Sequence, residues 1–550
     1  MSTMAAKLTF DVREVDGLLA FEDPHGVSGA APDEAARRPG AMLAVSARWG
    51  RLPADLRARI MTSADARLAP SGSPFLERDA IAREIARQNP HLAPPPADAL
   101  YVIAGQQAGL LTGPLYTILK AVSAIGAARR LAQDSGRPVL PLFWIAGEDH
   151  DLDEVNRITV NGRRFVFEPP GIERARGRMP QVADIPLDAA REPLLAFLRD
   201  ALPESEFKPW VLARVAELDF AGGFTAAFRG CMRALFDGCE LHLVDPLALR
   251  PWTAPVLARL IERWPEAEDA FARSTARLRA CGITPPLERL GFFEIVDGAR
   301  VPVEIDAAGF HLAGGVCGAR EAAERVRGEP ARFSPGAGLR PVCQDAALPV
   351  LAMAAGPSEL AYLMQIDALY PLADTRPAAR LPRVSATFLE PGVARAAELA
   401  GLDGAALFDA PRLLSASAGA ATAVTSALGQ DDARIAAIEA RARALLEALD
   451  RLPDARSSRR LRSSRAAIER AVGGVIERLR REQLEAAGLT RQRLEKIAAA
   501  VLPDGKPQER VANVTQFLGL HGPEFIARAV EALDPFRAAH RIVRISVERA

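Results

Sequence analysis

Apolar positions along the chain follow two periodicities, and the change from one to the other outlines an α/β core. A short apolar run at residues 100–104 is followed by a Gly-rich loop, a long helical run at 114–131 and a second apolar run at 138–146. Short apolar runs bounded by turn residues are typical of buried strands. The order therefore predicts a strand–helix–strand unit with parallel strands.

The same pattern resumes near residue 339. Residues 340–344 and 348–355 lead through Gly356-Pro357 into a helical run at 358–368, and the pattern closes at 381–389. The interval between the two halves contains helical runs and two hairpin signals, Asn161-Gly162 and Asp297-Gly298. We interpret the interval as modules inserted into a split core.

Beyond residue 392 the chain is rich in Ala, Arg, Glu and Leu, and apolar residues recur at spacings of three and four. The first such seam is Ile435, Ile438, Ala442, Leu445 and Leu449, and a second, beyond a break with Pro453, is Ile468, Val472, Val475 and Leu479. Heptad spacing predicts two antiparallel helices. Each seam is short, so a hairpin packed on its own core and an intermolecular coiled coil both remain open.

These patterns predict an α/β fold class with a C-terminal helical domain. The expected domains are a helical lead-in at 1–98, the first half of the core at 99–155, inserted connecting modules at 156–338, the second half of the core at 339–391, and a helical coiled-coil domain at 392–550.

Composition narrows the class of partner. Of the 550 residues, 69 are basic and 69 acidic, which removes the global field of a nucleic-acid or anionic-membrane binder, so we expect small-molecule or protein partners. The most apolar stretch, residues 113–128, is interrupted by Lys120, and the N-terminus lacks a secretory pattern. The five cysteines form no Cys-x-x-Cys pair, which fits a reduced cytoplasm and predicts no closed zinc site.

Two loops carry the candidate chemistry. Residues 105–117, with Gln106 and Gln107 beside three glycines, join the first strand to its helix, where ligands of open α/β sheets bind and a helix N-terminus offers N–H groups to anions. A structural tight turn explains this loop equally well. Residues 148–154 follow the second strand and place five carboxylates around His150. Crowded carboxylates at a strand end favour ligand binding, although capping of the next helix explains Asp151 or Asp153.

Residues 105–120, 143–154, 340–345, 356–365 and 382–390, with 502–513 and 521–525 in the tail, resemble the ordered motifs of the BshC family, the cysteine ligases of bacillithiol biosynthesis. The resemblance runs from about residue 100 to the C-terminus. It implies a Rossmann-like core related to class I nucleotidyl transferases, with inserted connecting modules and a coiled-coil dimerisation domain. It further implies a cytoplasmic, homodimeric ligase that joins L-cysteine to glucosaminyl-malate in the last step of bacillithiol synthesis.

The resemblance also assigns roles. It implies catalytic residues Asp149, His150 and Asp153, which orient an amine or act as general base, substrate-binding residues Gln106, Gln107, Thr112, Thr117, Tyr362 and Gln365, and nucleotide-binding residues Gly113, Arg383 and Ser385. ATP with Mg²⁺ is the expected co-substrate, and neither a tightly bound cofactor nor a protein-held metal is expected. The histidine signature of class I enzymes is absent at 112–117, and the late basic loop at 383–387 lacks its second lysine.

Two other functions compete with this one. The acidic cluster at 148–154 also suits a magnesium-dependent phosphotransferase or hydrolase. The second competing function is that of a non-catalytic scaffold, which binds a nucleotide and recruits partners through its helical tail. Metal-dependent phosphate release without a thiol product would indicate the first, and ligand binding without turnover the second.

Overall fold

The computed structural model describes residues 7–15, 73–74, 76–172, 178–416, 430–451, 459–486, 491–537 and 539–548. The chain divides into two compact units. One unit comprises residues 1–387 with 507–550, and the other comprises residues 388–506.

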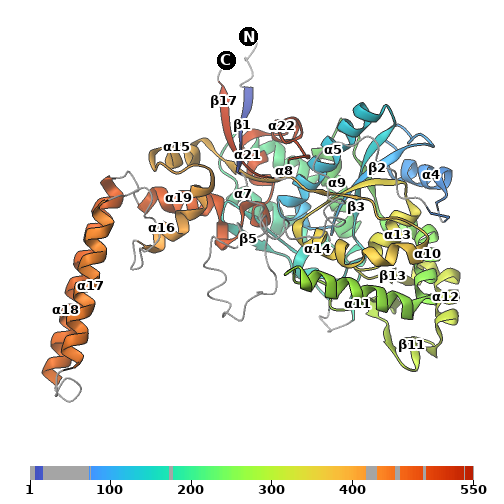
Figure 1. The fold of residues 1–550 in the computed structure, drawn as a ribbon. Coiled ribbons are helices and arrows are strands. Elements are labelled where there is room, and N and C mark those ends of the chain that lie inside the picture. Colours follow the sequence, from blue (N-terminus) through green and yellow to red (C-terminus); the bar gives the residue numbers. More distant parts are fainter. Residues whose placement is uncertain are drawn as a thin grey trace, which may run out of the picture. The chain divides into compact units, whose positions relative to one another are not determined.

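A five-stranded parallel sheet forms the centre of the first unit (Figure 1). Its strands, in spatial order, are β15 (Ala379–Pro382), β14 (Val350–Ala355), β2 (Leu100–Gln106), β3 (Val139–Ile145) and β7 (His242–Val244). The order reverses between β2 and β14, which is the topological switch point of a doubly wound sheet. The predicted Rossmann-like core, split between two stretches of chain, is confirmed.

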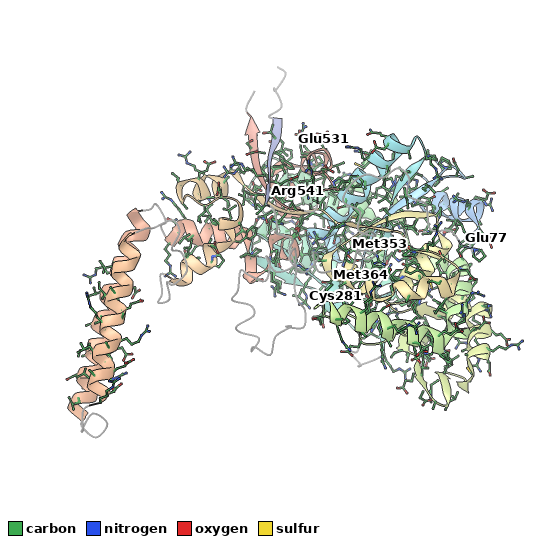
Figure 2. The ribbon with its side chains drawn as sticks, viewed as in Figure 1. Glu77, Cys281, Met353, Met364, Glu531 and Arg541 are labelled. Atoms are coloured by element: carbon green, nitrogen blue, oxygen red, sulfur yellow. The ribbon has the colours of Figure 1, made fainter. Side chains whose placement is uncertain are left out.

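Helices cover this sheet. Helix α5 (Tyr116–Ser135) connects β2 to β3 and packs against both. Ile81 and Ile85 of α4 (Arg78–Gln88) pack in one cluster with Tyr101 and Ile103 of β2. Met353 of β14 belongs to a second core cluster with residues of α10 (Arg250–Glu262), α11 (Trp264–Ala280), α13 (Arg340–Ala347) and α14 (Pro357–Gln365). Met353 and Met364, labelled in Figure 2, are both 3% exposed.

The interval between the core halves is mixed in structure. Its elements are β4 (Arg157–Val160), β5 (Arg163–Val166), β6 (Met179–Pro180), α7 (Arg191–Ala201), α8 (Lys208–Ala216), α9 (Gly223–Leu235), α10 (Arg250–Glu262), α11 (Trp264–Ala280), β8 (Phe292–Val296), β9 (Ala299–Pro302), β10 (Glu304–Asp306), β11 (Gly309–Leu312), β12 (Gly315–Cys317), α12 (Ala319–Gly328) and β13 (Phe333–Pro335). Both predicted hairpins form, and each turn has two residues with positive φ, Asn161-Gly162 and Asp297-Gly298. The prediction that 156–338 lies wholly outside the core is wrong, because β7 is an edge strand of the central sheet.

The chain ends are not helical, contrary to expectation. Strand β1 (Lys7–Val15) pairs antiparallel along its whole length with β17 (His540–Glu548), and β17 neighbours β16 (Ser385–Leu389). The sequence of β1 alternates apolar and polar residues, which suits a half-buried strand and not a helix. The expectations for residues 16–72 lie outside the described residues.

The second unit is helical within the described residues. Its helices are α15 (Pro391–Leu399), α16 (Ala410–Ala416), α17 (Gln430–Asp450), α18 (Arg459–Ala486) and α19 (Arg491–Val501). Helices α17 and α18 lie side by side as the heptad spacing predicts (Figure 1). The C-terminal domain predicted at 392–550 ends earlier, because α20 (Gln508–Val511), α21 (Thr515–His521), α22 (Glu524–Ala532) and β17 belong to the first unit.

The loop between β2 and α5 has an unusual backbone. Leu111, Thr112 and Gly113 have successive φ values of 44°, 73° and 68°, a conformation that costs about 1–3 kcal/mol for each non-glycine residue. Asn513, from the end of the chain, donates from Nδ2 to the carbonyl oxygens of Leu111 (2.8 Å) and Gly113 (2.6 Å). The tail therefore holds this loop in place.

Replacing Asn513 by alanine should lower the free energy of unfolding by about 2–3 kcal/mol, because two buried carbonyls lose their donors. Asn513→Asp keeps the acceptor for Thr515 but turns a buried carboxylate oxygen toward the same two carbonyls, so it should cost at least as much. Denaturant unfolding measures both. Wild-type stability in Asn513→Asp would show that the tail does not hold the loop.

Candidate active site

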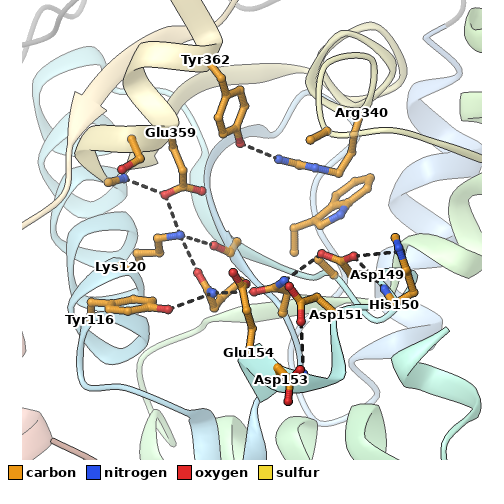
Figure 3. Close-up of a pocket in the computed structure, with 18 of the residues that line it drawn as sticks. Tyr116, Lys120, Asp149, His150, Asp151, Asp153, Glu154, Arg340, Glu359 and Tyr362 are labelled. Atoms are coloured by element: carbon orange, nitrogen blue, oxygen red, sulfur yellow. Dashed lines mark hydrogen bonds and ion pairs between the residues drawn. The ribbon is translucent and has the colours of Figure 1, made fainter. Parts of the chain in front are cut away.

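A cavity of about 840 Å³ lies at the carboxyl ends of β2, β3 and β14 (Figure 3). Its lining includes Gln106 from β2, Asp149 from the loop after β3, and Glu359 from α14. This position is the switch point of the sheet, where open α/β proteins bind their ligands.

Helix α5 and helix α14 are tied together in the wall of this cavity. Lys120 of α5 is 3% exposed, and its Nζ donates to the carbonyl oxygen of Gly105 (2.8 Å) and to Gln106 Oε1 (2.8 Å). Glu359 of α14 supplies the third acceptor, 2.6 Å away. Burial lowers the pKa of Lys120, and Glu359 opposes that shift. All three N–H groups of the ammonium are used, so Lys120 fixes the cavity wall.

The acidic loop after β3 is anchored by its backbone. Val182 N–H donates to the Asp149 carbonyl (2.7 Å) and Ala183 N–H to the Gly147 carbonyl (2.9 Å). A Cβ at Gly147 would lie 2.5 Å from Thr225 Oγ1, so only glycine allows this close approach. The loop thereby presents its carboxylates at a fixed place.

Asp149 is the most strongly held of these carboxylates. Gln107 Nε2 donates to Oδ2 (2.8 Å) and the His150 backbone N–H to Oδ1 (2.7 Å). Burial raises the pKa of Asp149, but the hydrogen bonds from His150 and Gln107 and the charge of Arg300 together outweigh it and hold the pKa well below its usual range. Asp149 is therefore an anion at neutral pH.

The other acids of the loop differ in their environment. Asp151 caps the short helix α6 (Leu152–Val155) by accepting from the Asp153 N–H, and Asp153 pairs with Arg157 at 3.0 Å. Desolvation raises the pKa of Glu154, and the carboxylates of Asp151 and Asp149 add to that shift. Burial and negative neighbours thus make Glu154 a better proton acceptor than an exposed glutamate, although the hydrogen bond to Gln107 opposes the rise in its pKa.

The opposite wall carries positive charge and a phenol. Arg340 donates to two neutral groups, Gln344 Oε1 and the Tyr362 hydroxyl, both at 3.1 Å. Burial raises the pKa of Tyr362 to about 12, so its proton remains available for donation. A cation bonded to neutral partners keeps its charge available for an anionic ligand.

Arg383 also lines the cavity, and its charge is already paired. Its guanidinium donates to Glu509 Oε1 at 2.7 Å, and Glu509 is fully buried. Ser385 donates to the same carboxylate, and its Oγ lies 2.8 Å from His540 Nδ1. His540 Nε2 lies 2.9 Å from Thr387 Oγ1. This buried network joins the tail to the core.

The structure brings seven of the twelve expected site residues to the cavity: Gln106, Gln107, Asp149, His150, Asp153, Tyr362 and Arg383. It places Thr112, Thr117, Gly113, Gln365 and Ser385 outside the lining. These five residues therefore do not line the cavity, and their expected contact with ligand stays a prediction.

Each of these five residues has a physical reason to be buried. Gly113 accepts from Asn513, and Thr112 in the same loop is 1% exposed. Thr117 is fully buried in the first turn of α5, and Ser385 donates to Glu509. Gln365 is fully buried and donates to Thr275 Oγ1 and the Leu287 carbonyl, both at 2.8 Å. The expected anion site at the start of α5 is also occupied, because the Leu115 N–H donates to the Ala512 carbonyl.

Sequence reasoning missed Lys120, Arg340 and Arg300 as site residues, and it included Glu154 only as one of the five carboxylates at 148–154. Lys120 had a readable signal, because a lone charge within the apolar stretch 113–128 must find a partner when it is buried. Arg300 had no signal, because it reaches the site from a hairpin 150 residues away in sequence.

The side chains and helices in the part of the chain that the structure describes also bear on two other kinds of protein, those that hold a metal ion and those that span a membrane. Within them, no group of three or more His, Cys, Asp or Glu side chains is arranged to hold a metal ion. Across the same ranges, no helix is long and apolar enough to cross a membrane.

The switch-point cavity and split parallel sheet define a Rossmann-like protein with a small-molecule site. Two family models match: "Bacillithiol biosynthesis BshC, N-terminal Rossmann-like domain" over residues 90–384 and "Bacillithiol biosynthesis BshC, C-terminal coiled-coil domain" over residues 431–545. The chain belongs to the BshC family of bacillithiol biosynthesis, as its motifs suggested.

Individual relatives agree. A Salinibacter ruber protein is 30% identical over 467 residues, covering 82% of this chain and 83% of the relative. A Geobacillus thermodenitrificans protein is 29% identical over 474 residues, covering 82% and 85%. Both carry the name "Putative cysteine ligase BshC". These names agree with the expectation of a ligase.

The buried network around His540 predicts a pH dependence of stability. Burial lowers the pKa of His540 to about 4, although Glu509 opposes this shift. The unfolded chain therefore binds this proton near pH 6.5 while the folded chain does not, so stability is lost as pH falls. Between pH 7 and pH 5 the loss should be about 2 kcal/mol.

His540→Gln cannot titrate, so its unfolding free energy should fall by about 2 kcal/mol less than that of the wild type over this range. The difference between the two proteins removes the contribution of the other histidines to the pH dependence of the unfolding free energy. Parallel pH profiles would contradict a neutral, buried His540.

Proposed function

We propose that the chain is a ligase that joins the carboxyl group of L-cysteine to the amino group of glucosaminyl-malate and so forms bacillithiol. Family membership supports the pathway. The observation that carries the proposal is the separation of charge in the cavity, with carboxylates on the loop after β3 and Arg340 with Tyr362 on the opposite wall.

The two walls match the two kinds of group on the substrates. Asp149 and Asp153 suit the ammonium and amino groups of cysteine and glucosaminyl-malate, whereas Arg340 and the Tyr362 hydroxyl suit carboxylates. Glu154 is the proposed general base that removes a proton from the attacking amine, because its pKa is raised.

A free carboxylate does not react with an amine, so it requires activation. We propose ATP with Mg²⁺ as the co-substrate, which would provide a phosphate-bearing leaving group. The charge of Arg340, which lines the cavity and is hydrogen-bonded to neutral partners, supports an anionic co-substrate on this side. The residues of this chain hold, orient and deprotonate the reacting groups.

The test is mass spectrometry of small thiols in a host that lacks its own cysteine-adding enzyme and is supplied with glucosaminyl-malate. The wild-type gene should produce bacillithiol. Arg340→Met should lower the rate about 30- to 150-fold, because about 2–3 kcal/mol of charge-assisted hydrogen bonding is lost.

Arg320→Met is the matched control, since this arginine is exposed on α12 away from the cavity, and it should retain the wild-type rate. Accumulation of glucosaminyl-malate with folded wild-type protein would refute the ligase proposal. An unchanged rate in Arg340→Met would refute the assigned anion wall.

We further propose that the chain is a homodimer through α17 and α18. One residue of each apolar seam is exposed to solvent, Leu445 by 50% and Val475 by 54%. Exposed apolar side chains at heptad spacing favour association with a second copy.

Leu445→Glu combined with Val475→Glu should convert the dimer to a monomer in light scattering, since each glutamate would be buried at the seam. Arg443→Glu with Arg478→Glu changes exposed polar positions on the same helices and should leave the dimer intact. A monomeric wild type, or a dimer that persists with both seam substitutions, would argue against this interface.

A further inference from the structure

Arg300 is a buried arginine that contacts the candidate site from outside its loops. It lies on β9, is 5% exposed, and donates from NH2 to the Pro335 carbonyl (3.2 Å) and from Nε to Ser334 Oγ (3.3 Å). Its Cζ lies 3.6 Å from the centre of the Phe293 ring. These contacts fix the guanidinium in one orientation.

The remaining nitrogen of Arg300 is directed to His150. Arg300 NH1 lies 2.8 Å from His150 Nδ1. Because a guanidinium has only donors, Nδ1 must be the acceptor and carry no proton. A neutral imidazole with a bare Nδ1 carries its proton on Nε2. His150 lines the cavity, so Nε2–H is the group it can offer to a ligand.

Without Arg300 the same histidine would behave in the opposite way. Asp149 Oδ1 lies 3.5 Å from His150 Nδ1, which is close to the arrangement in which a carboxylate holds a proton on Nδ1 and leaves Nε2 as a base. Arg300 NH1 is 3.6 Å from the same carboxylate oxygen and 2.8 Å from Nδ1. Arg300 therefore prevents an Asp–His base from forming.

We propose that Arg300 is a positioning residue that fixes His150 as an Nε2–H donor, so that His150 binds a substrate oxygen and does not deprotonate the amine. The identity of that oxygen, on the cysteine carboxyl group or on the oxyanion formed from it, rests on the proposed function. The tautomer of His150 does not.

The supporting structure comes from one hairpin. Phe293 of β8 contacts both Arg300 and His150, with the His150 and Phe293 ring centres 5.4 Å apart. Strand β9 also pairs with β6, whose Met179 lines the cavity. The sheet β13-β8-β9-β6 thus holds the donor chain from Arg300 to His150.

Nitrogen-15 NMR of the full-length chain with labelled histidine measures the tautomer directly, with the His150 signals assigned by their loss in His150→Gln. The wild type should show a protonated Nε2 and a bare Nδ1. Arg300→Met should move the proton to Nδ1, facing Asp149, and Arg300→Lys should restore the wild-type tautomer.

Arg250→Met is the matched control. Arg250 is 6% exposed in the same charged cluster, and it bonds to Gln181 and not to His150. It should destabilise the fold comparably and leave the His150 signals unchanged. A protonated Nδ1 in the wild type, or an unchanged tautomer in Arg300→Met, would overturn the proposal.

Turnover gives a second readout. The amide of His150→Gln can still donate a hydrogen bond, so bacillithiol formation should stay within about tenfold of wild type, whereas loss of a general base costs about 10²–10⁴-fold. A loss of that size in His150→Gln would overturn the donor role. A wild type that makes no bacillithiol while its tautomer is as described would refute only the proposed function.

Discussion

One buried ammonium group joins the two halves of the core. Lys120 Nζ reaches the end of β2, the side chain of Gln106, and Glu359 at the start of α14, and these acceptors come from stretches of chain more than 200 residues apart. Burying an ammonium is unfavourable unless each N–H finds an acceptor, so the three partners must assemble together. The distance between β2 and α14, and with it the width of the cavity at the switch point, follows from this requirement.

The topology of the sheet also separates negative from positive groups in the cavity, because they neighbour different strands in the sequence. The carboxylates lie on the loop after β3, which is held by backbone hydrogen bonds from residues 182 and 183. Arg340 and Tyr362 come from α13 and α14, the helices before and after β14 in sequence. The pKa values of these acids shift in opposite directions: hydrogen-bond donors and Arg300 keep Asp149 ionised, whereas desolvation, with the charges of Asp151 and Asp149, raises the pKa of Glu154. Neighbouring carboxylates with opposite shifts provide both an anion and a base in one small volume.

Local sequence signals predicted the parts of the fold that depend on local physics. Apolar runs gave β2, β3 and β14, the Asn-Gly and Asp-Gly pairs gave both hairpins, and the acidic loop gave Asp149, His150 and Asp153 in the cavity lining. What failed depends on distant partners. Thr112 and Gly113 were expected to contact a ligand, but their loop is hydrogen-bonded by Asn513, which is 400 residues away in sequence. No local pattern near His242 indicates that the three residues of β7 form an edge strand of the central sheet. The pairing of β1 with β17 links the two ends of the chain and leaves no local trace.

After residue 506 the chain belongs again to the first unit, so its C-terminal segment is part of the core and not of the helical unit. The helical unit ends at Lys506, yet the family's coiled-coil model continues to residue 545. Residues in that continuation are part of the core: Glu509 pairs with Arg383, Arg510 lines the cavity, and Asn513 holds the strained loop. Without this segment the buried guanidinium of Arg383 would lose its carboxylate partner at a cost of several kcal/mol, so the core reaches its observed form only when the segment is docked. The helical unit is thus inserted between two segments of the chain, one before residue 388 and one after residue 506, that both contribute to the site. Truncating the protein at residue 391 would therefore remove Arg510 from the cavity lining together with the helices.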